Sequence, residues 1–237
     1  MGLARRFVHG KLNGSVSPIS LPLPEHPVLS VALTPPAETS PKRAAILAAA
    51  ARLFMAGGYA TVSMDAVARE AGVSKATLYA YFAGKEALFG AIVGERCAAI
   101  AAQAEELAAH AASADGALRE MGRLWMRFLL EPASIAIHRI VIAECGRFPD
   151  LASTFYAAGP GAGRAWLMRR LAEEQRQGRL RADADSGVAA DHLMGLMRGE
   201  LYLRTILGGP TPDEAASNAV VDQAVEVFLR AYGVVVP

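Results

Sequence analysis

Cysteine is scarce in this 237-residue sequence, which has only Cys97 and Cys145, and neither belongs to a C-x-x-C pair. The common zinc and redox motifs built on such pairs are therefore missing, and nothing points to an oxidising compartment. Two interpretations of the cysteines remain, inert buried thiols or a redox-sensing pair. The sequence also lacks a Walker-type phosphate loop and a G-x-S-x-G motif, so it carries no signature of a nucleotide hydrolase or an α/β-hydrolase.

Long runs of alternating apolar and polar residues, which indicate β-strands, are missing as well. Alanine is abundant, and hydrophobic residues make up 53% of the chain, so the sequence predicts an all-α protein. The chain is long enough for one or two domains with a substantial core.

Net charge is also low, at +1, but it is unevenly distributed along the chain. Residues 41–86 carry a net charge of +3, residues 1–40 carry +1, and residues 87–237 carry −3. A basic segment attached to a slightly acidic body suits a protein that contacts nucleic acid with one end only.

Proline is frequent in residues 1–39, and this segment has no helical periodicity, so we expect a disordered proline-rich tail. Arg5 and Arg6 resemble the start of a twin-arginine export signal, but no continuous apolar stretch follows them. Two interpretations are a start codon assigned too early and a flexible extension. A third is an arm that holds phosphates or a minor groove with Arg5, Arg6, His9 and Lys11.

Residues 63–86 carry the most informative pattern, two short helices joined by a tight turn. Ser63 is placed to cap a helix over residues 64–71, and Ser74 to cap one over residues 75–82, because a serine hydroxyl accepts from amides of the first turn. Gly72 suits the left-handed conformation that ends a helix. The apolar residues that can pack the helices together are Met64, Val67, Ala68, Ala71, Val73, Leu78 and Phe82. The pattern is that of a helix-turn-helix, whose second helix enters the major groove, and the alternative is a plain helical hairpin.

Helices are also expected on both sides of this motif. Ser40-Pro41 predicts the start of the preceding helix, and Gly57-Gly58 predicts its end. Its apolar stripe comprises Ile46, Leu47, Ala50, Leu53 and Phe54. A long helix over about residues 84–109 follows the motif. Four of its side chains should face the motif (Leu88, Phe89, Ile92 and Val93), and two should face the remainder of the chain (Ile100 and Leu107).

Residues 67–89 read V-A-R-E-A-G-V-S-K-A-T-L-Y-A-Y-F-A-G-K-E-A-L-F and resemble the DNA-binding signature of the TetR family of bacterial regulators. The ordered set A-G-V-S, T-L-Y-x-Y-F and G-K-E-x-L-F carries the resemblance. It implies that the second helix approaches base edges with Lys75, Ala76 and Thr77. It also implies phosphate contacts from Tyr79 and Lys85, together with Lys42 or Arg43. The capping residues Ser63 and Ser74 complete the predicted DNA-binding set.

Glycine and proline divide the remaining chain into further helices. They are expected over residues 117–130, 132–145, 150–158, 166–177, 186–207 and 211–232, with the glycine-rich stretch 159–163 as an interruption. The segment R-F-P-D-L-A-S-T-F-Y-x-x-G-P, with the later G-R-L, D-x-D and G-L-M-R-G, resembles a TetR subgroup often found controlling multidrug-efflux operons. The resemblance therefore covers the chain from about residue 40 onward.

The last two expected helices are apolar over most of their circumference. From the residues alone, such helices belong either to a large core or to a surface that meets a partner. The family resemblance implies the second, a two-fold dimer built as a four-helix bundle. The residues expected at this interface are Leu193, Met197, Val220, Ala224 and Phe228.

Large side chains on helices that should converge predict an apolar ligand pocket, although each could also belong to an ordinary core. The candidates are Trp125, Phe128, His138, Phe155, Trp166, Met194 and Tyr202, with Met168 considered beside them. Arg139, Glu144 and Arg198 either face this pocket or are solvated.

A metal site would need clustered histidine, cysteine or carboxylate side chains. Only two groups come close, Asp191 with His192, and His138 with Glu144 and Cys145. We expect singly hydrogen-bonded histidines there, with no metal and no cofactor.

Taken together, these patterns predict an all-α protein in three parts. They are a tail over residues 1–39, a three-helix helix-turn-helix DNA-binding domain over residues 40–86, and a larger helical effector-binding and dimerisation domain over residues 87–237. The expected function is that of a cytoplasmic, non-enzymatic transcriptional regulator without membrane association. It would be a repressor that binds a palindromic double-stranded operator as a homodimer and is released by a small apolar effector. The alternatives are an effectorless architectural DNA-binding protein and an unrelated helical enzyme.

Overall fold

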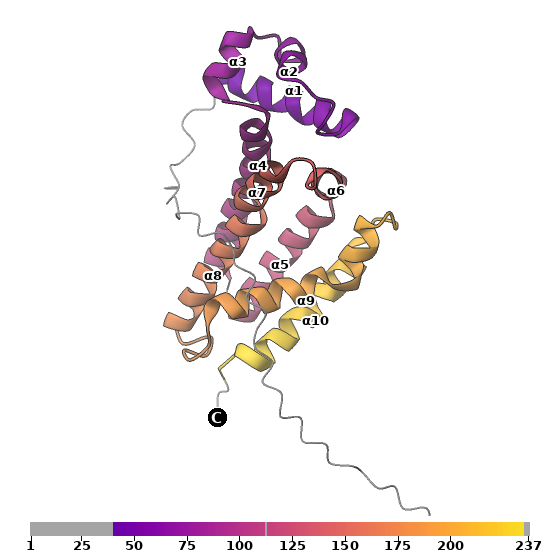
Figure 1. The fold of residues 1–237 in the computed structure, drawn as a ribbon. Coiled ribbons are helices and arrows are strands. Elements are labelled where there is room, and N and C mark those ends of the chain that lie inside the picture. The colour runs from indigo at the N-terminus through magenta and orange to yellow at the C-terminus, as the bar shows by residue number, and fades with distance from the viewer. Residues whose placement is uncertain (1–39, 112, 235–237) are drawn as a thin grey trace, which may run out of the picture. The chain divides into compact units, whose positions relative to one another are not determined.

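The computed structural model describes residues 40–111 and 113–234, which form ten α-helices (Figure 1). The all-α prediction is confirmed. In the described residues the only β-type pairing is an isolated bridge between Leu180 and Gly233. The predictions for the tail, including those for Arg5, Arg6, His9 and Lys11, lie outside the described residues.

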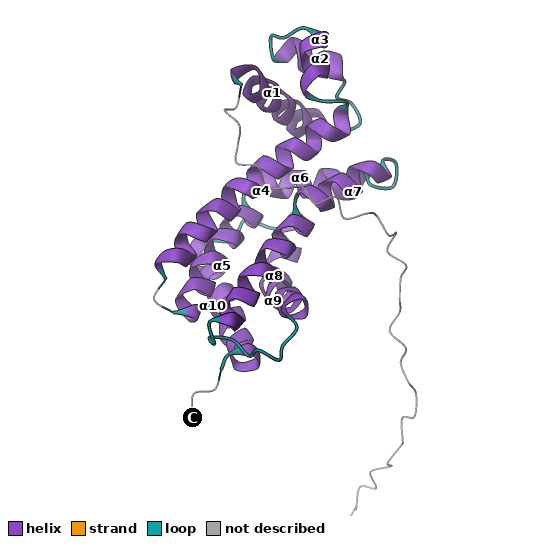
Figure 2. Cartoon of the chain, turned by 90° about the vertical axis from the view of Figure 1, so that its left-hand side faces the viewer, coloured by secondary structure: helices purple, strands orange, loops and turns teal. Residues whose placement is uncertain are grey.

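Three helices gather at one end of a long fourth helix, as Figures 1 and 2 both show. They are α1 (Pro41–Gly57), α2 (Met64–Glu70) and α3 (Lys75–Tyr81), and the long helix is α4 (Lys85–His110). The predicted start and end of α1 are confirmed, because it begins at Pro41 and Gly58 follows it with φ 78°. The Ser40 side chain does not cap α1, however. Its hydroxyl instead lies 2.8 Å from the Tyr81 hydroxyl.

The other six helices pack along and beside α4. They are α5 (Ala114–Leu130), α6 (Pro132–Glu144), α7 (Pro149–Ala158), α8 (Pro160–Arg176), α9 (Ser186–Ile206) and α10 (Glu214–Tyr232). α4 packs against α7 and α5, while α10 packs against α5 and α9 packs against α8. α9 is kinked at Gly199, where φ −3° and ψ −149° depart from helical values.

The glycine-rich stretch 159–163 was expected to interrupt the helices. The interruption is confirmed at Gly159, between α7 and α8, but the prediction is wrong for residues 160–163. α8 begins at Pro160 and contains the later glycines. Proline fits the first position of a helix because its missing N–H needs no partner there. A Cβ at Gly161 would lie 2.9 Å from the Tyr156 carbonyl oxygen, so glycine permits the close approach of α8 to the end of α7.

Two clusters of buried apolar residues form the core. The first surrounds Tyr59 and Phe89 and includes residues of α1–α4 together with Val141 of α6 and Leu151 of α7. The second joins the lower part of α4 to α5 and α8–α10, and the Phe228 side chain lies within it. The predicted division of α4 between two neighbours is confirmed. The four apolar residues assigned to the motif belong to the first cluster, and the two assigned to the remainder pack against the second.

α4 is also the one helix in the described part of the chain whose length and composition would suffice to cross a membrane. Its apolar side chains are used in the structure: Leu88 and Phe89 are buried in the first cluster, and Ala104 and Ala108 in the second. Both core clusters therefore account for the apolar character of this helix.

Candidate DNA-binding surface and effector cavity

The turn between α2 and α3 is held as the sequence predicts. Ser63 Oγ accepts from the Ala66 amide at 3.2 Å, and Ser74 Oγ accepts from the Thr77 amide at 3.1 Å. Gly72 between them has φ 67°, the left-handed conformation expected of it. These contacts satisfy amides that short helices leave unpaired at their N-termini. Both serine hydroxyls, which belong to the predicted DNA-binding set, are thus engaged in local structure.

α3 has one buried face and one exposed face. Leu78 is fully buried and Phe82 nearly so, and both belong to the first core cluster, while α3 packs against α2. Lys75, Ala76 and Tyr79 are exposed on the other side. Thr77 is half-buried, and its hydroxyl lies 2.9 Å from Ser74 Oγ. The predicted base-contacting residues therefore share the N-terminal, outward part of α3.

The basic side chains around α3 have weak partners within the chain. Lys75 Nζ lies 2.6 Å from Asp65 Oδ2, and both side chains are more than half exposed. Arg43 pairs with Glu95 and stacks over the Phe82 ring at 5.4 Å from its centroid. Lys42 is exposed at the start of α1. Exposed ion pairs contribute roughly 0–1 kcal/mol, so these cations can exchange their partners for phosphates at little cost.

Lys85, to which the family resemblance assigns a phosphate contact, also makes contacts within the chain. Its ammonium donates to the Tyr59 carbonyl at 2.9 Å and lies 4.3 Å from the centroid of the Tyr59 ring. The Tyr59 hydroxyl donates to Glu86 Oε1 at 2.8 Å, and burial raises the pKa of Tyr59. Lys85 thus ties the loop after α1 to the start of α4. An ammonium has three donors, so a phosphate contact would have to use one of the other two.

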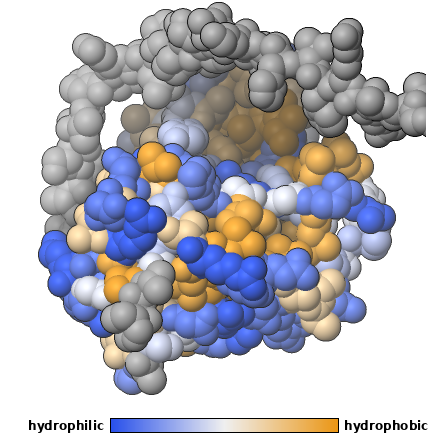
Figure 3. Space-filling model, turned by 90° about the horizontal axis from the view of Figure 1, so that it is seen from below, coloured by the Kyte–Doolittle hydropathy of each residue, from blue (hydrophilic) through white to orange (hydrophobic). Residues whose placement is uncertain are grey.

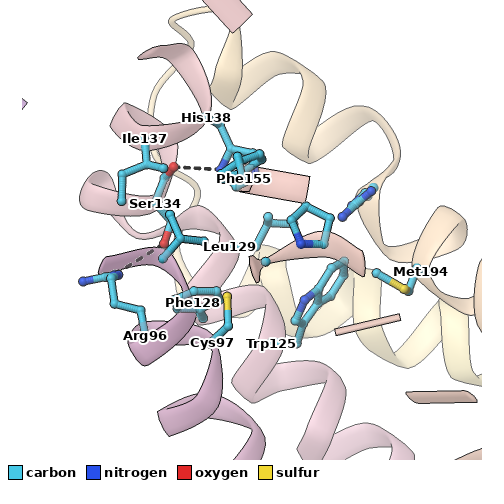
Figure 4. Close-up of a pocket in the computed structure, with 14 residues that line it drawn as sticks. Arg96, Cys97, Trp125, Phe128, Leu129, Ser134, Ile137, His138, Phe155 and Met194 are labelled. Atoms are coloured by element: carbon cyan, nitrogen blue, oxygen red, sulfur yellow. Dashed lines mark hydrogen bonds between the residues drawn. The ribbon is translucent and has the colours of Figure 1, made fainter. Parts of the chain in front are cut away.

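A first cavity of about 60 Å³ lies where α4, α5, α6, α7 and α9 meet (Figure 4). In the close-up, Trp125 and Met194 lie on one side of it, and Arg96, Ser134 and Ile137 lie on the opposite side. Its lining comprises Val93, Arg96, Cys97, Trp125, Phe128, Leu129, Ser134, Ile137, His138, Phe155, Gly159, Pro160, Met194 and Arg198.

A second cavity of about 80 Å³ lies between α4, α5, α8 and α9 and shares Trp125 and Met194 with the first. No ionisable side chain lines it. The lining comprises Ile100, Ala101, Ala104, Leu118, Met121, Gly122, Trp125, Gly163, Trp166, Leu167, Leu193, Met194 and Met197. The two cavities are therefore neighbours separated by one tryptophan and one methionine side chain.

Six of the seven predicted pocket residues line one or both cavities: Trp125, Phe128, His138, Phe155, Trp166 and Met194. Tyr202 lines neither, and its ring lies 6.0 Å from that of His138. Met168 packs against the second core cluster. Of the ionisable residues left open, Arg198 lines the first cavity. Arg139 donates to the carbonyls of Thr205 and Ile206 at the end of α9.

His138 is a neutral, locally bonded residue of the first cavity. Its Nδ1 lies 2.7 Å from the Ser134 carbonyl, so Nδ1 carries the proton because a carbonyl only accepts. Burial, together with the nearby charge of Arg198, lowers the pKa of His138. The edge of its ring meets Phe155 at a centroid distance of 5.1 Å.

Sequence reasoning missed three cavity residues on α4: Val93, Arg96 and Cys97. Ile100, which was assigned to an apolar stripe, lines the second cavity one turn further along. Residues at these spacings share one face of a helix. This periodicity was the available signal, and it would have placed the whole strip toward the pocket.

The residues chosen for the dimer interface require a correction. Four of them, Leu193, Met197, Ala224 and Phe228, are only 1–3% exposed and belong to the second core cluster of their own chain. Val220 is partly buried against the same cluster. Side chains already covered by their own chain cannot form a surface for a partner. The apolar residues that α9 and α10 expose are instead Val188, Leu196, Leu203 and Val227, with Leu207 just beyond α9.

Seen from below, the molecular surface is largely hydrophilic, with separate apolar patches between charged side chains (Figure 3). In residues 40–111 and 113–234, no three potential metal ligands come together. Asp191 is engaged by Arg164 at 2.6 Å, and His192 Nδ1 lies 2.6 Å from the Tyr232 hydroxyl.

Comparisons with protein families identify both halves of the chain. The family of bacterial regulatory proteins called tetR matches residues 46–92, which span most of α1, the helix-turn-helix and the start of α4. The C-terminal domain of AefR-like transcriptional repressors matches residues 116–234, which span α5–α10.

Individual proteins agree with these matches. The flavonoid-responsive regulator FrrA is 35% identical, with a TM-score of 0.65 over 81% of this chain and 97% of its own. A TetR-family transcriptional regulator from Mesorhizobium loti is 27% identical, with a TM-score of 0.72 over 84% of this chain and 100% of its own. An uncharacterized HTH-type transcriptional regulator of Mycobacterium tuberculosis is 29% identical over 81% of this chain and 90% of its own.

Proposed function

Because the chain belongs to the TetR family of bacterial transcriptional regulators, we propose that it is a repressor that binds a palindromic operator as a homodimer. A small, largely apolar effector fills the two cavities and releases the protein from DNA. The proposed site of action is the cytoplasm, where operator DNA is accessible.

One observation carries this proposal. α4 has one end buried in the helix-turn-helix core through Leu88 and Phe89, and two turns later its Arg96 and Cys97 line the first cavity. A rigid helix that belongs to both sites couples them, since a change in the shape of the cavity displaces the base on which α3 rests. At about 60 and 80 Å³, the cavities are smaller than typical ligand pockets, so the effector widens them as it binds.

On DNA, the N-terminus of α3 enters the major groove. Lys75, Ala76 and Thr77 reach base edges, while Tyr79 and Lys42 hold the backbone on either side. The ion pair between Lys75 and Asp65 opens as the DNA binds, because phosphates and bases offer that ammonium alternative acceptors. Lys85 has a double role in this arrangement. Its ammonium keeps the hydrogen bond to the Tyr59 carbonyl and directs a second N–H to a phosphate.

The dimer forms through the exposed face of α9 and α10. Val188, Leu196, Leu203 and Val227 are each 40–51% exposed and follow the outer side of the two helices. Apolar side chains gathered on one face of neighbouring helices are typical of a protein interface. In a two-fold dimer, the same face of each protomer meets its partner and the two α3 helices lie about 34–36 Å apart, one turn of DNA.

Genomic footprinting of the full chain tests this function. We expect protection of inverted-repeat sites whose half-sites lie one helical turn apart. A ligand screen on the recovered site then follows. It starts from flavonoids, because one relative is a flavonoid-responsive regulator, and from the amphipathic carboxylates argued below. Retention of random and genomic sequences with equal affinity would contradict the repressor proposal and favour an architectural protein.

A further inference from the structure

The two arginines of the first cavity differ in how their charges are balanced. One terminal nitrogen of Arg96 donates to Glu131 Oε1 at 2.8 Å, and it lies 3.4 Å from Ser134 Oγ. No carboxylate in the described residues lies within 4 Å of Arg198. The Nε of Arg198 is buried and has no hydrogen-bond partner. Arg198 therefore brings an unbalanced positive charge to the cavity wall.

Other arginines show that this arrangement is unusual within the protein. Arg123 and Arg170 also have a buried Nε without a partner. Arg123, however, pairs with Glu120 and Asp222, and Arg170 pairs with the buried Glu174. Their charge is neutralised inside the chain, whereas that of Arg198 is not. Arg198 is partly exposed, but a buried polar atom without a hydrogen bond is costly, so an acceptor from outside the chain would stabilise its Nε.

The groups around Arg198 add no negative charge. Its guanidinium carbon lies 5.6 Å from the centroid of the Trp125 ring, which stacks beneath it. His138 uses its Nδ1 proton on the Ser134 carbonyl, and the Tyr202 ring lies beside the His138 ring. None of these neighbours is a carboxylate, and Arg198 lines the cavity beside them.

The second cavity differs from the first because it carries no charge. Its lining is apolar and free of ionisable side chains, and it meets the first cavity at Trp125 and Met194. A molecule that extends from one cavity into the other would place one end beside Arg198 and the other end among Met121, Trp166 and Leu167. The first cavity therefore suits a charged head group, and the second cavity suits an apolar body.

We propose that the effector is an amphipathic carboxylate, whose head pairs with Arg198 and whose apolar body passes Trp125 and Met194 into the second cavity. The planar guanidinium matches a carboxylate, which can accept two parallel hydrogen bonds from it. This inference rests on the proposed effector-released repressor and adds the chemical class of the effector. Arg198 is a ligand-binding residue in this account, and Trp125 orients it.

Intrinsic fluorescence tests the inference directly, because the only two tryptophans of the chain, Trp125 and Trp166, line the cavities. Decanoate is titrated against decanol, and phenylbutyrate against phenylbutanol, so that each pair differs only in its head group. We expect each carboxylate to bind the full chain roughly ten- to a hundredfold more tightly than its alcohol, as a charge-assisted hydrogen bond predicts. Arg198→Gln should abolish this preference and leave the affinity for the alcohols within about twofold.

Arg123→Gln is the matched control, since its Nε is equally unpartnered but it lies outside both cavities. It should lower the melting temperature and retain the preference for the carboxylate. If Arg198→Gln does not fold, Arg198→Met decides. Loss of the preference in the folded methionine variant supports the inference, and a preference that survives there contradicts it.

Three results would overturn the inference: equal affinity for acid and alcohol in the wild type, an equal loss of both in Arg198→Gln, or no binding of either pair. None of these would remove the proposed DNA-binding function, which is measured without any probe by operator retention. A protein that binds carboxylates but retains no specific DNA would instead contradict the proposed function alone.

Discussion

The helix-turn-helix and the helical body use their charged side chains in different ways. Around α3, Lys42 is exposed, and Lys75 has only an exposed partner in Asp65. In the body, charges join helices to one another. Arg119 of α5 binds Asp222 of α10 at 2.9 Å, and Glu174 is only 1% exposed where Arg170 and Arg179 enclose it. Cations at the motif remain available to an external anion, whereas those of the body hold the fold.

Arg198 of the body also lacks a carboxylate partner in the described residues. Other such arginines of the body, for example Arg127 and Arg204, are exposed, whereas Arg198 is partly buried and lines the first cavity. The comparison therefore predicts two places where the protein takes an anion from outside, the surface of α3 and the first cavity. Variants in the two regions test this difference in the use of charged side chains, beginning with the largest expected effect.

The largest difference is expected between two neighbours on α10. Phe228 is 1% exposed and Val227 is 50% exposed. Phe228→Glu should lower the free energy of unfolding by at least about 4 kcal/mol, because it removes a large buried ring and introduces an unpaired buried charge. Val227→Glu should leave the monomer fold intact and dissociate the dimer. Urea unfolding and sedimentation velocity measure the two effects. A Val227→Glu protein that stays dimeric would move the interface away from α10.

Glu174 and Asp65 compare a body charge with a motif charge. Glu174→Ala should destabilise the fold by about 3 kcal/mol, because removing the buried carboxylate leaves the largely buried Arg170 uncompensated. Asp65→Ala should have an effect below about 1 kcal/mol, since its pair with Lys75 is exposed. Urea unfolding of both variants checks this. Equal losses of stability in the two variants would mean that charged side chains of the motif contribute as much to folding as those of the body.

The same pair predicts a pH dependence. The hydrogen bond from Arg179 is the main cause that holds the pKa of Glu174 below its usual range. A carboxyl whose pKa is lowered by folding stabilises the protein fully above its unfolded pKa, about 4.3 for glutamate. The stability advantage of the wild type over Glu174→Ala should therefore be constant at neutral pH and decline as the pH falls through the lowered pKa. Unfolding curves measured across this range test the sign.

Lys85 tests whether one cation can serve both purposes. Lys85→Ala should weaken operator and random DNA alike and lower the salt slope by about one unit, as expected for a lost phosphate contact. It should also lower the melting temperature, because the Tyr59 carbonyl loses its donor. Lys42→Ala, the exposed control, should lower the salt slope without a change in melting temperature. If Lys85→Ala changes stability alone, the phosphate role of Lys85 is wrong.

The smallest expected effect concerns Thr77. Thr77→Ala removes a side chain assigned to a base edge and should relax sequence preference at one position in each half-site, by roughly 1 kcal/mol. The salt slope should stay near its wild-type value, because no phosphate contact is lost. Binding to a set of single-base operator variants measures the preference. A uniform loss across all sequences would place Thr77 on the backbone instead.

The parts of the fold that follow from local chemistry were predictable from the sequence. Ser63, Gly72 and Ser74 were assigned from the residues alone, because a cap or a left-handed turn depends on only three or four neighbouring residues. The glycine-rich start of α8 was not, since proline before glycine can begin a helix as well as end one.

Contacts between segments that are distant in the sequence were harder to predict. Helices α9 and α10 are apolar on nearly all sides, so periodicity could not distinguish the buried face with Phe228 from the exposed face with Val227. Lys85 was assigned to DNA by resemblance, and its bond to the Tyr59 carbonyl depends on how the loop after α1 meets α4. For Arg198 the sequence left burial and solvation open, because only the fold shows that no carboxylate approaches it in the described residues.

The central claim is that the cavity and the DNA-binding surface are coupled through α4, and linkage tests it most directly. Once an operator and a binding carboxylate are identified, operator affinity is measured with and without the carboxylate, and carboxylate affinity with and without the operator. Coupling requires both affinities to fall by the same factor, in the range of about 5- to 150-fold. A carboxylate that binds free and operator-bound protein equally well would contradict the claim, even if both sites prove genuine.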